Sequence, residues 1–136
     1  MAGIKTLHYV DIKKVATFMP SGEGMSITLA QGAAWSKVLF SEASCNTVSE
    51  GDAFSHTVNA TVPSKGKVSA RDLMELCYGR YIVKATDNNG VSWLIGDTEE
   101  GLRFAFEDVN EGTAEGETAY RLTFSGLSMW PQMKNM

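Results

Sequence analysis

Two histidines and two cysteines are the residues best suited to chemistry in this chain of 136 residues. His56 has apolar residues at i−2 and i+2, and this position suits a catalytic base or a metal ligand. It equally suits a histidine that is hydrogen-bonded at the edge of a core. No cysteine or histidine lies at metal-ligand spacing from His56, so the sequence favours the core histidine. A dyad with Cys45 or Cys77 is the weaker catalytic alternative, because buried thiols are usually inert.

Acidic residues gather in the loops between residues 87 and 100. Asp97, Glu99 and Glu100 could act as paired carboxylates or bind calcium, but the spaced Asp/Asn ladder of a calcium loop is missing. Carboxylates in loops are more often solvated turn formers. The chain also lacks G-x-S-x-G, the Walker loop and G-x-G-x-x-G. The sequence therefore predicts a protein that is not an enzyme, with no catalytic residue, no cofactor and no metal.

Three tryptophans could provide aromatic faces on which sugar rings stack. Trp93 is better placed in the core by the hairpin register described below. Trp35 and Trp130 are open to packing, to an interface or to a ligand. The tail, residues 128–136, carries apolar side chains without the pattern of any element, so we expect it to dock on the body of the domain or on another subunit. The candidate interface residues are Trp35, Met129, Trp130 and Met133.

The composition fits one β-rich domain over residues 1–136, long enough to bury a core without disulfides or metals. The formal net charge of −4 argues against nucleic-acid binding on a basic surface. No apolar run approaches the roughly 20 residues that span a bilayer, and the first residues lack the apolar segment of a secretory signal. Two cysteines do not make a disulfide framework. We therefore expect a soluble protein in a reducing cytoplasm, with neither nucleic acid nor a membrane as a partner.

A β-hairpin is predicted over residues 81–96, with Asn88-Asn89-Gly90 at its turn. A two-residue loop would pair Trp93 with Thr86, whereas a three-residue loop pairs it with Ala85. Only the second arrangement puts Tyr81, Val83 and Ala85 on the same face as Val91, Trp93 and Ile95, so burial selects it. This register needs the turn glycine in the left-handed region, in the bulge that follows a type I turn.

Alternating apolar and polar residues predict the remaining strands. The clear ones are 25–29, 54–62, 102–106 and 120–124, and the weaker ones are 35–40, 44–49 and one or two strands over 4–18 with a bend near Lys13–Lys14. Turn signals separate about seven to ten short strands, with no rhythm of alternating strands and helices. The predicted fold class is mainly β, an antiparallel sandwich or barrel with one short α-helix.

The helix is predicted at about residues 69–78. Ser69 can cap the helix, with Asp72 in a capping-box arrangement. Val68 and Leu73 lie at the two positions of a hydrophobic staple. Gly79 follows the last turn, where a left-handed cap is common.

Two connections carry few apolar residues. Residues 63–67 lead into the helix and form a possible soft joint within the domain. Residues 110–118 are rich in Gly, Glu and Thr, and we expect them to be mobile because they have little to bury.

One stretch resembles a known class of proteins. Its segments are Leu76-Cys77-Tyr78-Gly79, Tyr81-Ile-Val-Lys-Ala-Thr-Asp-Asn-Asn-Gly90, Trp93-Leu-Ile-Gly96, Leu102-Arg-Phe104 and Tyr120-Arg-Leu-Thr-Phe124-Ser-Gly126. Residues 76–126 resemble small virion or tail-associated structural proteins from phages and prophages of Bacteroides-like bacteria. The resemblance covers a little over a third of the chain. It implies a non-enzymatic assembly subunit, part of a tail, a tail tube or a neck ring.

Three functions stand open. The first is a phage structural protein that self-associates into a ring or tube by heterologous contacts, with other virion proteins as further partners. Such a protein resides in the host cytoplasm during assembly and then in the virion. The second is a carbohydrate- or protein-binding β-sandwich module that uses Trp35, Trp130 or loop residues. The third is an enzyme whose site has no recognised motif.

Overall fold

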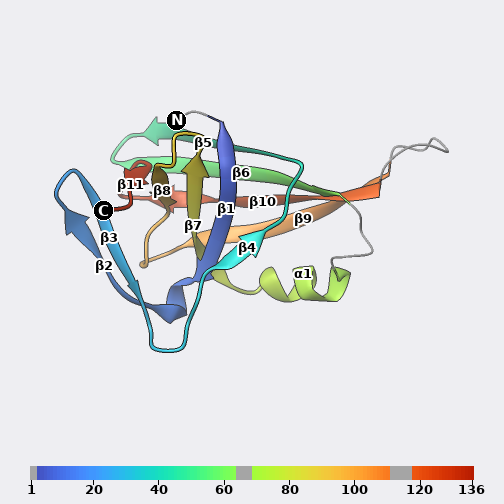
Figure 1. Cartoon of the computed structure of the whole chain (residues 1–136), viewed down its shortest axis with the longest axis horizontal. Coiled ribbons are helices and arrows are strands. Elements are labelled where there is room, and N and C mark those ends of the chain that lie inside the picture. The colour runs from blue at the N-terminus through green and yellow to red at the C-terminus, as the bar shows by residue number, and fades with distance from the viewer. Residues whose placement is uncertain (1–2, 64–68, 111–117) are drawn as a thin grey trace.

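The computed structural model describes residues 3–63, 69–110 and 118–136, so most of the two polar connections at 63–67 and 110–118 lies outside the described residues. Figure 1 shows the predicted mainly β arrangement with one short helix, α1 (Ala70–Leu76). The strands are β1 (Ile4–Asp11), β2 (Val15–Ser21), β3 (Gly24–Leu29), β4 (Ser36–Val38), β5 (Glu42–Glu50), β6 (Ala53–Pro63), β7 (Arg80–Asp87), β8 (Ser92–Ile95), β9 (Leu102–Asn110), β10 (Thr118–Ser128) and β11 (Met133–Lys134). A 3₁₀ turn at Ile12–Lys14 confirms the predicted bend.

Nine of these strands form two layers, and their ladders are antiparallel. One layer contains β5, β6, β10 and β9 in that order, and the other contains β4, β1, β7, β8 and β11. The layers join where β7 pairs briefly with β9, at Tyr81–Leu102 and Arg80–Arg103. In Figure 1, β1 and β7 run across β6 and β10, because the sheet folds over on itself. The sheet is not closed into a barrel, and β2 and β3 form a separate two-stranded sheet.

An apolar cluster with members from both layers forms the main core. Phe104 and Phe124 meet edge to face with ring centres 5.1 Å apart, and Tyr81 lies 5.8 Å from Phe124 in the same manner. The Tyr81 hydroxyl donates a hydrogen bond of 2.8 Å to the carbonyl oxygen of Leu76, and burial raises the pKa of this phenol to about 12. The end of α1 is therefore tied directly to the aromatic centre of the core.

The helix spans only Ala70–Leu76, so it is shorter than predicted. Ser69 is its N-cap, but the side chain makes no cap hydrogen bond and the capping-box prediction is wrong. Val68, one half of the predicted staple, lies outside the described residues. Gly79 is not in the left-handed region, so that prediction is wrong as well. A Cβ on Gly79 would lie 2.4 Å from the Tyr81 hydroxyl oxygen, which shows that close packing requires the glycine.

The hairpin of β7 and β8 has the predicted register, with Ala85 opposite Trp93. Gly90 has a φ of 83°, as the predicted turn requires. Asp87 organises the turn, because its Oδ1 accepts hydrogen bonds of 2.9 and 3.0 Å from two backbone N–H groups and its Oδ2 accepts one of 3.2 Å from Trp93 Nε1. Burial alone would raise the pKa of Asp87, but these hydrogen bonds outweigh it and hold the pKa below its ordinary value.

The tail, residues 128–136, docks on the body of the domain. Its strand β11 pairs with β8, with Met133 opposite Leu94. The last N–H, of Met136, donates a hydrogen bond of 2.9 Å to the carbonyl oxygen of Met25 in β3. The prediction that the tail forms no element is therefore wrong. It missed β11 because a two-residue strand has no periodicity, and the described residues form eleven strands rather than seven to ten.

Candidate functional site

A buried histidine holds the start of the tail. His56 in β6 is 0% exposed, and both of its ring nitrogens have hydrogen-bond partners. Thr47 Oγ1 lies 2.8 Å from Nδ1, and Ser128 Oγ and the carbonyl oxygen of Trp130 lie 2.8 and 2.9 Å from Nε2. The prediction of a hydrogen-bonded core histidine is confirmed. In this structure His56 forms no dyad with either cysteine, because both of its ring nitrogens are hydrogen-bonded to other groups.

One arrangement of protons satisfies this whole network. His56 Nε2 donates to the Trp130 carbonyl, while the Thr47 hydroxyl donates to Nδ1 and accepts from the Gln132 side-chain amide at 2.8 Å. The Ser128 hydroxyl donates to the same carbonyl at 2.7 Å. Burial lowers the pKa of His56, and the opposing effect of the bonded carbonyl is smaller. The imidazole is therefore neutral at pH 7 and fixes the tail.

The four predicted interface residues lie in different surroundings. Trp35 is half-buried and covers Lys84, whose Nζ lies 4.5 Å from the ring centre. Met129 is 63% exposed, whereas Trp130 and Met133 are half-buried in the docked tail. Of the four, only Met129 offers a large exposed apolar side chain to a partner.

A hollow of about 490 Å³ lies beside the tail. Its walls come from β5, β6, β8 and the tail, and its lining residues are Thr47, Ser49, Phe54, Trp93, Pro131 and Gln132. Trp93 is half-buried and is not part of the main core cluster, so its predicted place in the core is wrong. The hairpin register alone could not show this, because the burial of Trp93 depends on segments about 40 residues away along the chain.

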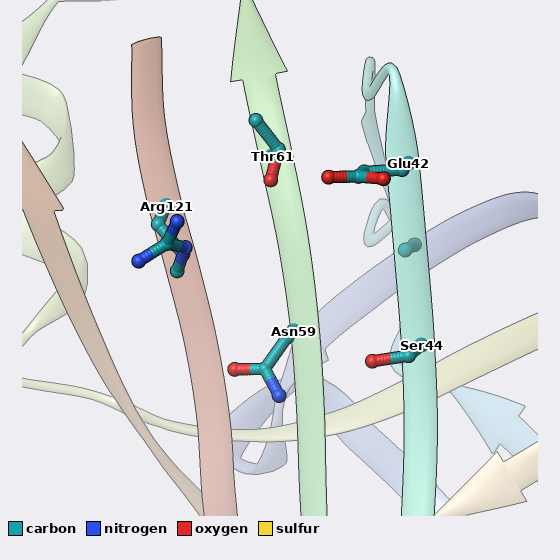
Figure 2. A pocket seen from close by; sticks show the side chains of 6 residues that line it. Glu42, Ser44, Asn59, Thr61 and Arg121 are labelled. Atoms are coloured by element: carbon teal, nitrogen blue, oxygen red, sulfur yellow. The ribbon is translucent and has the colours of Figure 1, made fainter. Parts of the chain in front are cut away.

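A second hollow, of about 450 Å³, lies on the outer face of the layer that contains β5, β6 and β10. Figure 2 shows its labelled side chains projecting from three neighbouring strands: Glu42 and Ser44 from β5, Asn59 and Thr61 from β6, and Arg121 from β10. The Arg121 guanidinium also forms an exposed ion pair with Glu107 of β9. This surface offers hydrogen-bond donors and acceptors to a polar partner. Alternation along each strand predicted which residues face outward, but not which strands are neighbours.

The other candidate groups have structural roles or remain exposed. Asp97 Oδ1 accepts hydrogen bonds of 3.1 Å from the N–H groups of both Glu99 and Glu100, so it organises their loop. Burial raises the pKa of the half-buried Cys45 thiol to about 12, whereas Cys77 is exposed. Within residues 3–63, 69–110 and 118–136, no three His, Cys, Asp or Glu side chains gather where they could hold a metal ion.

Two strand edges are open in the layer of β5, β6, β10 and β9. β5 pairs with β6 on one side, and no described strand pairs with its other side. β9 pairs with β10 along its length, but its other side pairs with β7 only at Leu102 and Arg103. The side chains of Val48 and Leu127, 50% and 45% exposed, flank Ser55 in one row on the outer face. Open edges carry N–H and C=O groups that can pair with another chain.

Comparisons with known proteins identify no family for this chain. No protein-family model, no curated protein and no solved structure matches it. The resemblance of residues 76–126 to phage structural proteins therefore stays a prediction. In the described part of the chain, no helix is long and apolar enough to cross a membrane.

Proposed function

We propose that this chain is a non-enzymatic assembly subunit that associates with copies of itself into a ring or tube, as a phage tail or neck protein. Its partners are copies of itself and other virion proteins, and neither nucleic acid nor a membrane takes part. It resides in the host cytoplasm during assembly and in the virion afterwards. The open edge of β5 is the observation that carries the proposal.

Among the described residues, nothing gives the free edge of β5 the usual protection against pairing. The strand has nine residues, so its open edge is about 30 Å long at roughly 3.3 Å per residue. Natural edge strands are commonly guarded by lysine, proline or a covering segment, and Glu42–Glu50 contains neither lysine nor proline. Its only charged residues are the two terminal glutamates. An unguarded edge of this length fits a strand that a partner covers.

The two open edges also suit a ring. Closed rings need heterologous contacts, in which one surface of a subunit meets a different surface of the next. β5 and β9 bound the same four-stranded layer on opposite sides, as Figure 1 shows. Pairing of β5 in one copy with the open part of β9 in the next joins these layers into one continuous sheet. Closure of that sheet then removes both open edges.

Light scattering over a concentration series, with negative-stain imaging of the same fractions, tests the proposal. We expect rings or tubes from the wild-type chain. Val48→Lys places a charge near the C-terminal end of β5 at a half-exposed position, and we expect this variant to remain monomeric and folded. Gln31→Lys adds the same charge in an exposed loop and should assemble like the wild type.

Two outcomes contradict the proposal. A wild-type chain that stays monomeric over the whole series argues against self-association. Normal assembly of Val48→Lys excludes β5 as the contact, even if rings form.

A further inference from the structure

We propose that the hollow beside the tail binds a neutral saccharide, with one sugar ring stacked on the indole of Trp93. The hollow measures about 490 Å³, within the range of about 300–1,000 Å³ that is usual for small-molecule sites. The inference does not depend on assembly into rings, because binding is measured directly at Trp93.

The aromatic part of the site is held in place before any ligand arrives. Trp93 Nε1 donates to Asp87 Oδ2 at 3.2 Å, and this hydrogen bond fixes the orientation of the indole and occupies its only polar atom. What remains for a ligand is the apolar ring, and Phe54 of β6 adds a second ring to the same hollow. A preorganised ring loses little conformational freedom on binding. Flat aromatic faces match the C–H face of a sugar ring.

The polar part of the site is neutral. Thr47, Ser49 and Gln132 supply hydroxyl and amide groups, and none of the described residues that line the hollow is charged. Gln132 uses one amide N–H on Thr47, and an amide carries a second N–H and an oxygen for further hydrogen bonds. The Thr47 hydroxyl already donates to His56 and accepts from Gln132, so Ser49 and Gln132 are the groups that can both donate to and accept from sugar hydroxyls. Lys134 stands opposite Trp93 in the β8–β11 pair, but it does not line the hollow.

These features favour a saccharide over the other occupants of an aromatic hollow. A purely apolar peptide side chain would cover the hydroxyl and amide groups without pairing them, which is unfavourable. A phosphate or sulfate would find no cationic side chain among the lining residues to balance its charge. A neutral ligand with one apolar face and a rim of hydroxyls satisfies both kinds of lining group.

Nuclear magnetic resonance titration of the full chain tests the proposal with defined probes. The probes are tetrasaccharides of β-1,4-linked glucose, α-1,4-linked glucose and β-1,4-linked N-acetylglucosamine, with a sulfated tetrasaccharide and a proline-rich peptide as comparators. We expect at least one neutral probe to shift the indole N–H signal of Trp93 and the side-chain amide of Gln132, and to leave the Trp35 signal unchanged.

Matched variants identify the site. Trp93→Ala should weaken the binding of that probe by about tenfold or more, as loss of an aromatic contact of this kind implies, whereas Trp35→Ala should bind like the wild type. Ser49→Ala combined with Gln132→Ala leaves the aromatic rings in place and should weaken binding as well, which covers the case in which Trp93→Ala misfolds.

Three results overturn the proposal: no neutral probe shifts Trp93, binding is unchanged in both site variants, or the sulfated probe or the peptide binds more tightly than every neutral probe. None of these results depends on whether the chain forms rings. Light scattering on the same samples reports assembly separately, so failure of one proposal is distinguishable from failure of the other.

Discussion

The substitution His56→Phe tests whether the buried histidine fixes the tail. Phenylalanine retains a planar ring of comparable size, so the change removes hydrogen bonds without opening a large cavity. Both ring nitrogens of His56 lose their partners, Thr47 on one side and Ser128 and Trp130 on the other.

The expected loss follows from the contacts that remain. Ser128 still donates to the Trp130 carbonyl at 2.7 Å, and Gln132 still donates to Thr47 at 2.8 Å, so no partner is left without a hydrogen bond. The cost is then the net value of the hydrogen bonds at the two ring nitrogens, about 0.5–1.5 kcal/mol each. We expect the free energy of unfolding of His56→Phe to fall by about 1–3 kcal/mol at pH 8.

Urea unfolding followed by tryptophan fluorescence measures this loss, and amide hydrogen exchange locates it. We expect faster exchange of the backbone amides in the tail, residues 128–136, with little change in β6 itself. His8→Phe is the matched control, because the half-buried His8 has a buried Nδ1 without a hydrogen-bond partner. His8→Phe should change the free energy of unfolding by no more than about 0.5 kcal/mol. It should leave amide exchange in the tail unchanged.

The difference between His56→Phe and the wild type should also depend on pH. Burial lowers the pKa of His56 in the folded state below its ordinary value of 6.5, so the unfolded chain binds more protons at acidic pH. The wild type therefore loses this contribution as the pH falls below about 6.5 and through the folded-state pKa. His56→Phe has no such contribution to lose, so the difference in the free energy of unfolding between the two proteins should narrow as the pH falls. Equal urea midpoints at pH 8 with unchanged tail exchange would refute the role of His56.

Three further predictions follow from local contacts. A Cβ on Gly24 would lie 2.0 Å from the carbonyl oxygen of Lys134, so Gly24→Ala should cost about 1–3 kcal/mol in urea unfolding and speed tail amide exchange; normal exchange would contradict the contact. Thiol titration of the native chain at pH 8 should detect Cys77 rapidly and Cys45 slowly, because burial raises the pKa of Cys45 to about 12; Cys77→Ser should remove the fast phase. Glu107→Gln breaks an exposed ion pair and should change the unfolding free energy by less than about 1 kcal/mol; a larger loss would show that the pair is not solvent-screened.

Local patterns in the sequence predicted much of the fold. Alternation over 54–62 marked β6, because a strand with one buried face needs apolar residues at every second position. The register of the β7–β8 hairpin followed from Gly90 and from burial, since a slip of one residue would have exchanged the faces. Both signals arise between residues that are close in the chain.

The site depended on contacts that no local pattern encodes. His56 meets Ser128 and Trp130, which follow it by 72 and 74 residues, so its burial was predictable from the apolar residues around it, but its partners were not. Ile82 of β7 lies on the opposite face from Tyr81, Val83 and Ala85, yet it is 0% exposed. Such burial is decided only when distant strands are brought together.

What the sequence by itself determined was most of the strands, the short helix and the hairpin register, because backbone geometry and alternating burial act within a few residues. Tertiary structure alone decided that no described strand pairs with the outer edge of β5, that Trp93 lines a hollow instead of the core, and that the tail pairs with β8. These outcomes depend on which strands become neighbours. Neighbouring strands are selected by the packing of the whole chain, since many pairings satisfy the same local pattern.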